Sequence, residues 1–404
     1  MYVVLVIWLV AQIITLVYYR NTPQFSDAKD YEALAAHCYA VGTFYPDSSQ
    51  VYSRFIFNPG YVNYLVLHLM VFGSLSLVGF FNILLNLLIA FEIFYLCKSL
   101  FNKNVAYIAV ILYCLLPSNV LLVQPHLTEI LFLALTFGAI CLVRKDRYGA
   151  IVLAGVLFAL ANWVRPVVVL FVLPLLLYMI FNRFNYRNYL AMFVPFLLCV
   201  LLIAGAAKQN SGHFIIQAST GGYNLLQGAN DEMNGGYGNA CFKEGKIGYI
   251  ENEDALTYAE RDAIWKERSV RWVLDHPMKY VGYIPVKMAR MWWGDDYLDG
   301  FLSSDAPFYG THPTTRDKLG RVLSGAMFSL TYYIIMACFC VALFSLRKKM
   351  TKNDWLLLLP LILGTLMQAL IYGTQRYHYP YMPIVVLFAA WWIYSKLTKK
   401  DAYG

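Results

Sequence analysis

Long apolar runs separated by short polar connections dominate the chain. The runs long enough to cross roughly 30 Å of hydrocarbon cover residues 1–19, 78–97, 105–122, 127–143, 149–163, 166–182, 189–207, 321–346, 354–373 and 378–395. Another apolar stretch, residues 61–72, is too short to span and follows Asn58-Pro59-Gly60, so we expect an interfacial helix there. The pattern predicts an all-α polytopic membrane protein with about ten transmembrane helices.

Polar residues concentrate in two long connections, residues 20–77 and 208–320. The second is too long for an idle connection and too polar for the membrane. We therefore expect three parts: an N-terminal transmembrane module, residues 1–207, which includes the first long loop; an extracytoplasmic segment, residues 208–320; and C-terminal transmembrane helices, residues 321–404.

The distribution of charge predicts the orientation. If the N-terminus is cytoplasmic, the predicted cytoplasmic loops contain 14 lysines and arginines, whereas the short outside loops hold only Arg165 and Arg376. Because Lys and Arg accumulate in cytoplasmic loops, both termini are expected in the cytoplasm. The first apolar run lacks a basic start and a small-residue cleavage site, which indicates a retained span. Without retention or transit signals, a bacterial inner membrane is favoured.

Composition excludes a soluble domain. Hydrophobic residues make up 59% of the 404 residues and charged residues 14%, whereas soluble domains carry about a quarter charged residues. The net charge of +8 indicates no nucleic-acid partner, because the loop asymmetry explains it. Of the eight cysteines, which show no zinc-ligand pattern, only Cys38 and Cys241 fall in predicted outside loops. A disulfide between these two is one hypothesis, since oxidation is permitted there.

Two carboxylates stand at a predicted helix start just after the first span. In SDAKDY, residues 26–31, the side chains of Asp27, Asp30 and Tyr31 share one helical face if Ser26 is the N-cap. Such a face can hold a general base. The alternative, which the six residues leave open, is that these acids only complement the helix dipole.

Further charged residues stand at the predicted outer membrane face. His126 and Glu129 begin the fourth span, where Glu129 also fits a dipole role. Arg54, Arg165 and Arg376 lie on the side that positive charge avoids. An anionic phosphate suits these arginines, and snorkelling to lipid headgroups is the alternative.

The segment after the seventh span contains two notable patterns. Residues 221–239, GGYNLLQGANDEMNGGYGN, are rich in glycine, which permits a backbone that wraps closely around a ligand. Later, Lys279, Lys287 and Arg290 stand among aromatic residues, a pattern that suits anionic lipid headgroups. His378, near the last span, is typical of an interfacial aromatic residue rather than a metal ligand.

The order of these segments resembles the GT-C superfamily of polyprenyl-phosphate-sugar-dependent glycosyltransferases. The resemblance is to the glycosyltransferase family 39-like enzymes, which are related to protein O-mannosyltransferases and lipid A aminoarabinose transferases. It rests on the ordered set SDAKDYEALA, NPGY, LTEILF, WVRPVVVL, GGYNLLQGAN and QRYHYPYMP, and extends from residue 1 to about residue 395. Several relatives have Lys before the Pro-rich helix or an Asp-Glu pair in the first motif, where this chain has Asn58 and Asp27-Ala28.

The resemblance implies a GT-C fold and the transfer of a hexosyl or pentosyl unit to an acceptor hydroxyl at the periplasmic face, by single displacement with inversion. The partners it implies are a polyprenyl-phosphate-sugar donor, a glycan, lipid or protein acceptor, and the bilayer. Asp27 would be the base or acceptor orienter, with Asp30 and Glu129 as supporting carboxylates that could also hold a divalent cation; no cofactor is certain. The implied substrate-binding residues are Tyr31, Arg54, His126, Arg165, Tyr223, Asn224, Arg376 and Tyr377.

A transporter or flippase of a lipid-linked glycan is the alternative. It would show internal repeats and broken helices with polar groups near the bilayer midplane, and the sequence shows no convincing repeat. Release of sugar from a polyprenyl-phosphate donor would distinguish the two classes.

Overall fold

The computed structural model describes residues 1–24, 26–44, 58–211, 214, 216, 220–295 and 315–398, and these residues form helices and connections without any strand. The prediction of an all-helical protein is confirmed for this part of the chain. The helices are α1 Tyr2–Tyr18, α2 Ser26–Val41, α3 Pro59–Phe72, α4 Val78–Leu100, α5 Lys103–Cys114, α6 Ser118–Leu121, α7 Glu129–Val143, α8 Tyr148–Val164, α9 Val169–Phe181, α10 Tyr186–Ser211, α11 Gly221–Gly228, α12 Tyr258–Asp275, α13 Pro277–Trp292, α15 Thr315–Leu346, α16 Lys352–Leu370 and α17 Met382–Thr398. The 3₁₀ turns are η1 Pro166–Val168, η2 Ala240–Phe242, η3 Glu253–Ala255 and η4 Gln375–Tyr381.

Among the described residues, five helical segments are long and apolar enough to cross a membrane. They are α4, α16 and the segments Tyr186–Gln209, Ser329–Leu346 and Gln375–Thr398. The other predicted spans appear as apolar helices of 10–17 residues, so the count of ten stays a prediction. A helix is present at the expected place as α3, whose first residue is Pro59, and its position at the membrane interface stays a prediction.

Two predicted element boundaries are wrong. The run 105–122 is not one helix, because α5 ends at Cys114 and the chain turns before the short α6. Pro117 explains the break, since it lacks an N–H and disfavours helical geometry in the residue before it. Ser26 is the first residue of α2 rather than the residue that caps it.

One large hydrophobic cluster holds the membrane-type helices together. In it α8 packs against α7 and α10, α4 packs against α5 and α7, and α17 packs against α5 and α15. Small residues permit the close approaches: a Cβ on Gly155 of α8 would lie 2.2 Å from the carbonyl oxygen of Met192 in α10. Such backbone contacts are typical of helices that pack in membranes.

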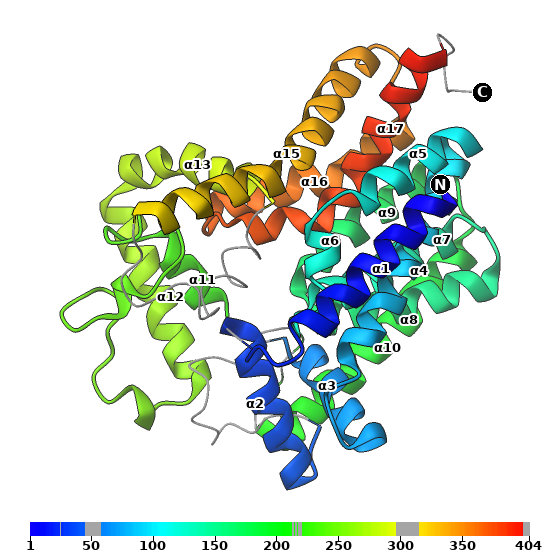
Figure 1. Cartoon of the computed structure of the whole chain (residues 1–404). Coiled ribbons are helices and arrows are strands. Elements are labelled where there is room, and N and C mark those ends of the chain that lie inside the picture. The colour runs from blue at the N-terminus through cyan, green and yellow to red at the C-terminus, as the bar shows by residue number, and fades with distance from the viewer. Residues whose placement is uncertain are drawn as a thin grey trace.

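The helices α11, α12 and α13 lie together on one side of the bundle, next to α16 (Figure 1). They have a small core of their own, which includes Tyr223, Phe242 and Trp265. The glycine-rich run is needed to seat α11, because a Cβ on Gly222 would lie 1.9 Å from the Asp262 carbonyl oxygen. On Gly228 it would lie 1.5 Å from the carbonyl oxygen of Ile371. This run therefore follows the protein's own backbone closely.

The disulfide hypothesis is wrong. Cys38 packs in the large cluster, whereas Cys241 packs in the small core around Trp265, and the two are not bonded to each other. Both side chains are buried, which fits the behaviour of Cys as a small hydrophobe.

The basic residues of α13 do not form the expected lipid-facing set. Lys287 is completely buried, with its ammonium 3.5 Å from the Leu370 carbonyl oxygen and 4.1 Å from the Tyr280 ring centre. Burial lowers the pKa of Lys287 to about 8. Lys279 pairs with Asp231 at 2.6 Å. These contacts attach α13 to the glycine-rich run and to the end of α16. Both segments also border the candidate functional site.

Candidate functional site

A cavity of about 430 Å³ lies where segments far apart in the sequence meet. Its walls come from α2, from the turn that joins α8 to η1, from α11, from the end of α16 and from η4. Seven of the predicted site residues line it: Asp27, Tyr31, Arg165, Tyr223, Asn224, Arg376 and Tyr377. The first long loop, the segment after residue 208 and the C-terminal helices thus contribute to one site.

Two arginines and two carboxylates form a charged cluster at this cavity. Glu129 is completely buried, and Arg165 Nη1 lies 2.8 Å from its Oε1. Arg376 donates from Nη2 to Glu129 Oε2 at 3.2 Å and from Nε to Oε1. Arg376 also donates from Nη1 to Asp27 Oδ2 at 2.5 Å. One guanidinium therefore bridges both carboxylates, and the second guanidinium shares Glu129 with it.

Local sequence explains where these side chains are. Glu129 is the first residue of α7, and Asp27 lies in the first turn of α2. Arg165 follows the end of α8 in an extended conformation, with φ −150° and ψ 129°, because the residue before a proline avoids helical geometry. Arg376 lies in η4, after α16 has ended. All four charged groups thus stand at the ends of helical elements.

Arg165 and Arg376 converge on one site, since both contact Glu129 and both line the cavity. The arginines do not snorkel, because their side chains are only 10% exposed. Two positive and two negative side chains balance within the cluster. Hydrogen-bonded partners of opposite charge are what a buried charge requires.

Tyrosines dominate the rest of the wall. Tyr31, Tyr223, Tyr237, Tyr372, Tyr377 and Tyr381 all line the cavity. The hydroxyls of Tyr372 and Tyr377 are hydrogen bonded to each other, and the ring centres of Tyr237 and Tyr372 lie 5.4 Å apart. The sequence analysis missed Tyr237, Tyr372 and Tyr381. Tyr381 belongs to the QRYHYPYMP segment and Tyr237 to the glycine-rich run 221–239, but nothing in a sequence this rich in tyrosine distinguished Tyr372.

Tyr31 connects the first motif to the start of α3. Asn58 Nδ2 donates a hydrogen bond to the Tyr31 hydroxyl at 2.8 Å, and Tyr61 packs edge-on at 5.2 Å. Burial, together with the charge of Asp27, raises the pKa of Tyr31. Its phenol is therefore a neutral hydrogen-bonding group beside Asp27.

Glu129 is not part of the cavity wall but holds the two arginines that are, and two further predicted site residues of the described chain also lie outside the cavity. Asp30 and His126 are absent from its described lining, and His126 Nδ1 pairs with Glu32 Oε1 at 2.6 Å. Asp30 lies one turn further along α2 than Asp27 and is not part of the cavity wall. Arg54 lies outside the described residues.

Asp30 should make stability depend on pH. Burial and the neighbouring charge of Asp27 raise its pKa to about 6 from 3.8. The folded state then holds the Asp30 proton more tightly than the unfolded state does. The contribution of Asp30 to the free energy of unfolding therefore falls as pH rises from about 4 to 6. We expect Asp30→Asn to raise the thermal midpoint at pH 8. The gain in the free energy of unfolding should be only about 1 kcal/mol, because Asp30 is partly exposed and solvent screens its charge. The advantage should vanish near pH 4 in thermal unfolding of the purified protein, and an equal difference at both pH values would contradict the assignment.

A buried histidine holds η4 from behind the charged cluster. His378 Nδ1 lies 3.0 Å from the Met291 carbonyl oxygen, and its Nε2 lies 3.4 Å from Asp295 Oδ1. His378 is only 2% exposed, so the expectation of an interfacial aromatic residue is wrong. The turn that carries Arg376 is thereby attached to the end of α13.

The cluster offers poor ligands for a divalent cation as it stands. Among the residues that the structure describes, no three His, Cys, Asp or Glu side chains come together. Asp27, which lines the cavity, and Glu129, which is buried behind the arginines, are both bonded to Arg376. A divalent cation would have to displace a guanidinium from these oxygens. The proposed reaction therefore has no step that depends on such a cation.

Part of the chain matches a class of membrane glycosyltransferases. The family model described as dolichyl-phosphate-mannose-protein mannosyltransferase matches residues 59–207, which include Glu129 and Arg165. The match covers less than half of the chain and confirms the resemblance there. No curated protein matches the chain.

Solved structures of an Archaeoglobus fulgidus oligosaccharyltransferase are similar over 98% of this chain at 14% sequence identity. The complex with Zn and sulfate has a TM-score of 0.48 and is covered over 49% of its length. The complex with an inhibitory peptide and a dolichol-phosphate has a TM-score of 0.47 and is covered over 50%. The chain therefore spans about half the length of these proteins.

Proposed function

We propose that this protein is a membrane glycosyltransferase that moves a sugar from a polyprenyl-phosphate donor to an acceptor hydroxyl. The observation that carries the proposal is the cavity in which Asp27 and the pair Arg165 and Arg376 face the same space. The match to the mannosyltransferase family over residues 59–207 supports it. Such a donor needs cations for its phosphate and a base for the acceptor, and this cavity provides both.

In the proposed reaction the acceptor hydroxyl attacks the anomeric carbon of the sugar. A bond forms between the acceptor oxygen and that carbon, and the bond from the carbon to the phosphate oxygen breaks. The hydroxyl proton passes to the Asp27 carboxylate, and the electron pair leaves with the polyprenyl phosphate. This is a single displacement, so the anomeric configuration inverts.

The arginines are suited to the leaving group. A phosphodiester carries one negative charge and the released monoester carries up to two, so negative charge grows at the phosphate during the reaction. Guanidinium groups that meet this charge stabilise the transition state more than the bound donor. The phosphate also competes with Asp27 for Arg376, and its binding would release Asp27 to accept the proton.

Glu129 has a supporting role in this proposal. It is completely buried behind the arginines and holds both guanidinium groups, so it fixes their positions and does not reach the acceptor. The run 221–239 would act as a lid, since Tyr223, Asn224 and Tyr237 already line the cavity. The periplasmic position of the site and the cytoplasmic termini rest on the loop charges alone.

The test is transfer by purified protein in liposomes that contain synthetic polyprenyl-phosphate hexoses or pentoses. We expect one donor to release polyprenyl phosphate, measured by mass spectrometry, in step with acceptor glycosylation. Full retention of every donor together with movement of a lipid-linked glycan across the bilayer would establish the transporter alternative. Transfer that survives EDTA would show that no divalent cation is required.

Replacement of Arg376 by Lys should raise the donor KM by about tenfold to a hundredfold, the range for lost hydrogen bonds to charged groups. Lys keeps the charge but cannot contact two carboxylates and a phosphate from one planar group. Arg165→Lys should act in the same direction. Arg187→Lys, at the exposed start of α10, is the matched control and should leave KM unchanged. An unaltered donor KM in Arg376→Lys would remove the phosphate role.

A further inference from the structure

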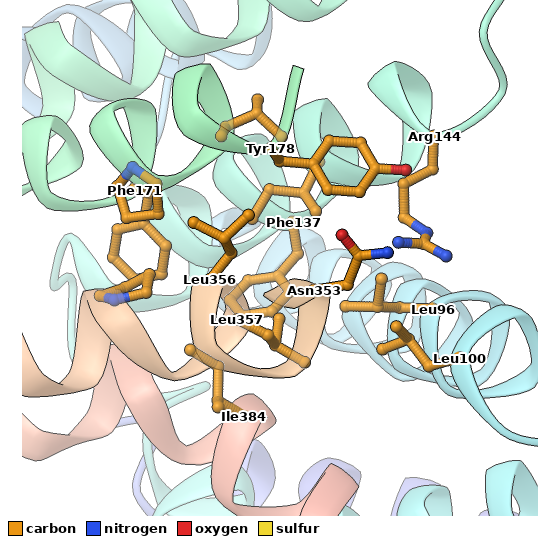
Figure 2. Close-up of a pocket in the computed structure, with 14 residues that line it drawn as sticks. Leu96, Leu100, Phe137, Arg144, Phe171, Tyr178, Asn353, Leu356, Leu357 and Ile384 are labelled. Carbon is orange, nitrogen blue, oxygen red and sulfur yellow. The ribbon is translucent and has the colours of Figure 1, made fainter. Parts of the chain in front are cut away.

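A second pocket, of about 50 Å³, is shown in Figure 2. It lies at the end of α7 opposite to the charged cluster. Glu129 starts α7 and Arg144 follows its last residue, so the two ends are separated by roughly 20 Å along that helix. Helices α4, α7, α9, α16 and α17 supply the walls. The lining is mainly apolar and includes Leu96, Phe137 and Leu357.

One side of this pocket is polar and positive. Arg144, Tyr178 and Asn353 lie together there (Figure 2). Arg144 Nε donates to Ser99 Oγ at 3.1 Å, and the guanidinium carbon lies 5.6 Å from the Tyr178 ring centre. The pocket therefore combines an apolar interior with a fixed cation at its edge.

The charge of Arg144 is not compensated by the described residues. None of the salt bridges among them involves Arg144. Asp354, on the facing helix α16, is buried and accepts hydrogen bonds from Thr351 N at 2.8 Å and Thr351 Oγ1 at 2.7 Å. A guanidinium without a carboxylate partner beside an apolar pocket leaves a place for an anion with a hydrocarbon part.

More positive charge stands at the same end of the helices. Lys145 and Arg147 follow α7, Lys349 precedes α16, and Lys352 is the first residue of α16. Lys352 Nζ lies 5.4 Å from the ring centre of Phe181, at the end of α9. The end of the bundle with this pocket is thus the basic end, and it would meet anionic lipid headgroups at the membrane surface.

We propose that this pocket binds an anionic phospholipid. A short part of one acyl chain enters between α9 and α16, and the phosphate meets the Arg144 guanidinium with the Asn353 side chain beside it. Charge complementarity selects this occupant, because a zwitterionic lipid would place its own cation among Lys349 and Lys352. The pocket lies far from the charged cluster, and the proposal does not depend on sugar transfer.

The experiment titrates the full chain in neutral detergent with dioleoyl phosphatidylglycerol or dioleoyl phosphatidylcholine and counts bound lipid by native mass spectrometry. We expect phosphatidylglycerol to be retained in preference to phosphatidylcholine. Arg144→Gln should weaken that retention by a factor of about five, the effect of one cation near an anionic surface. Arg147→Gln is the matched control, because Arg147 is nearby and exposed but does not line the pocket.

Leu357→Phe provides a second variant, since it fills the pocket and keeps Arg144. This variant should also lower the retention of phosphatidylglycerol. If Arg144→Gln does not fold, Leu357→Phe still tests whether the apolar part of the pocket binds the lipid. Equal binding of the two lipids would overturn the proposal, as would equal losses in Arg144→Gln and Arg147→Gln. Loss of phosphatidylglycerol in Arg376→Lys would also overturn it, because the lipid would then occupy the charged cavity.

Discussion

Asp27→Asn is expected to abolish most sugar transfer while the protein still folds. Asp27 lies in the first turn of α2, where Asn keeps the size of the side chain, and the dipole contribution that is lost is at most about 1 kcal/mol. Arg376 would keep Glu129 as its buried partner. Loss of a positioned base typically lowers the rate by a factor of roughly a hundred to ten thousand, so kcat should fall by that amount.

Asp30→Asn is the matched control, since it changes the same residue type one turn further along α2, outside the cavity lining. It should keep the transfer rate within a few-fold. The measurement is single-turnover release of polyprenyl phosphate, with donor affinity measured in parallel. An Asp27→Asn protein that transfers sugar at the normal rate would mean that Asp27 only holds Arg376. No other described carboxylate lines the cavity to replace it.

The sequence alone predicted the charged residues of the site better than its walls. Asp27, Arg165 and Arg376 stood out because a charge next to an apolar helix is costly and therefore rare. Their convergence could be expected from the topology, which brings the outer ends of the helices together. The direct contact of Glu129 with both arginines could not, because it depends on side-chain directions at three helix ends.

The walls were harder to predict for physical reasons. Tyr237 and Tyr372 come from a loop and from a helix end more than a hundred residues apart. The close seating of Gly228 on Ile371 and the hydrogen bond from Gly373 N to the Gly235 carbonyl oxygen bring them together. The place of Lys287 was predicted wrongly because a lysine on an amphipathic helix usually faces water or headgroups. Here it is buried against Leu370. Helix periodicity indicates a polar face without showing which element covers it.

Glu129→Gln is expected to have the largest effect on stability. It leaves two guanidinium groups with Asp27 as the one carboxylate of the cluster, and removal of one partner from a buried ion pair typically costs about 3–5 kcal/mol. We expect a much lower thermal midpoint in detergent and low abundance in the membrane. Sugar transfer should also be lost, because the arginines would no longer be held in position.

A double variant separates charge balance from catalysis. Glu129→Gln with Arg165→Gln removes one charge of each sign and leaves the pair of Asp27 and Arg376, 2.5 Å apart. The double variant should recover a large part of the thermal midpoint, because no buried guanidinium remains without a partner. It should not recover transfer, since the leaving phosphate has lost one of its two arginines. A double variant no more stable than Glu129→Gln would show that Glu129 contributes by packing α7 rather than by neutralising the arginines.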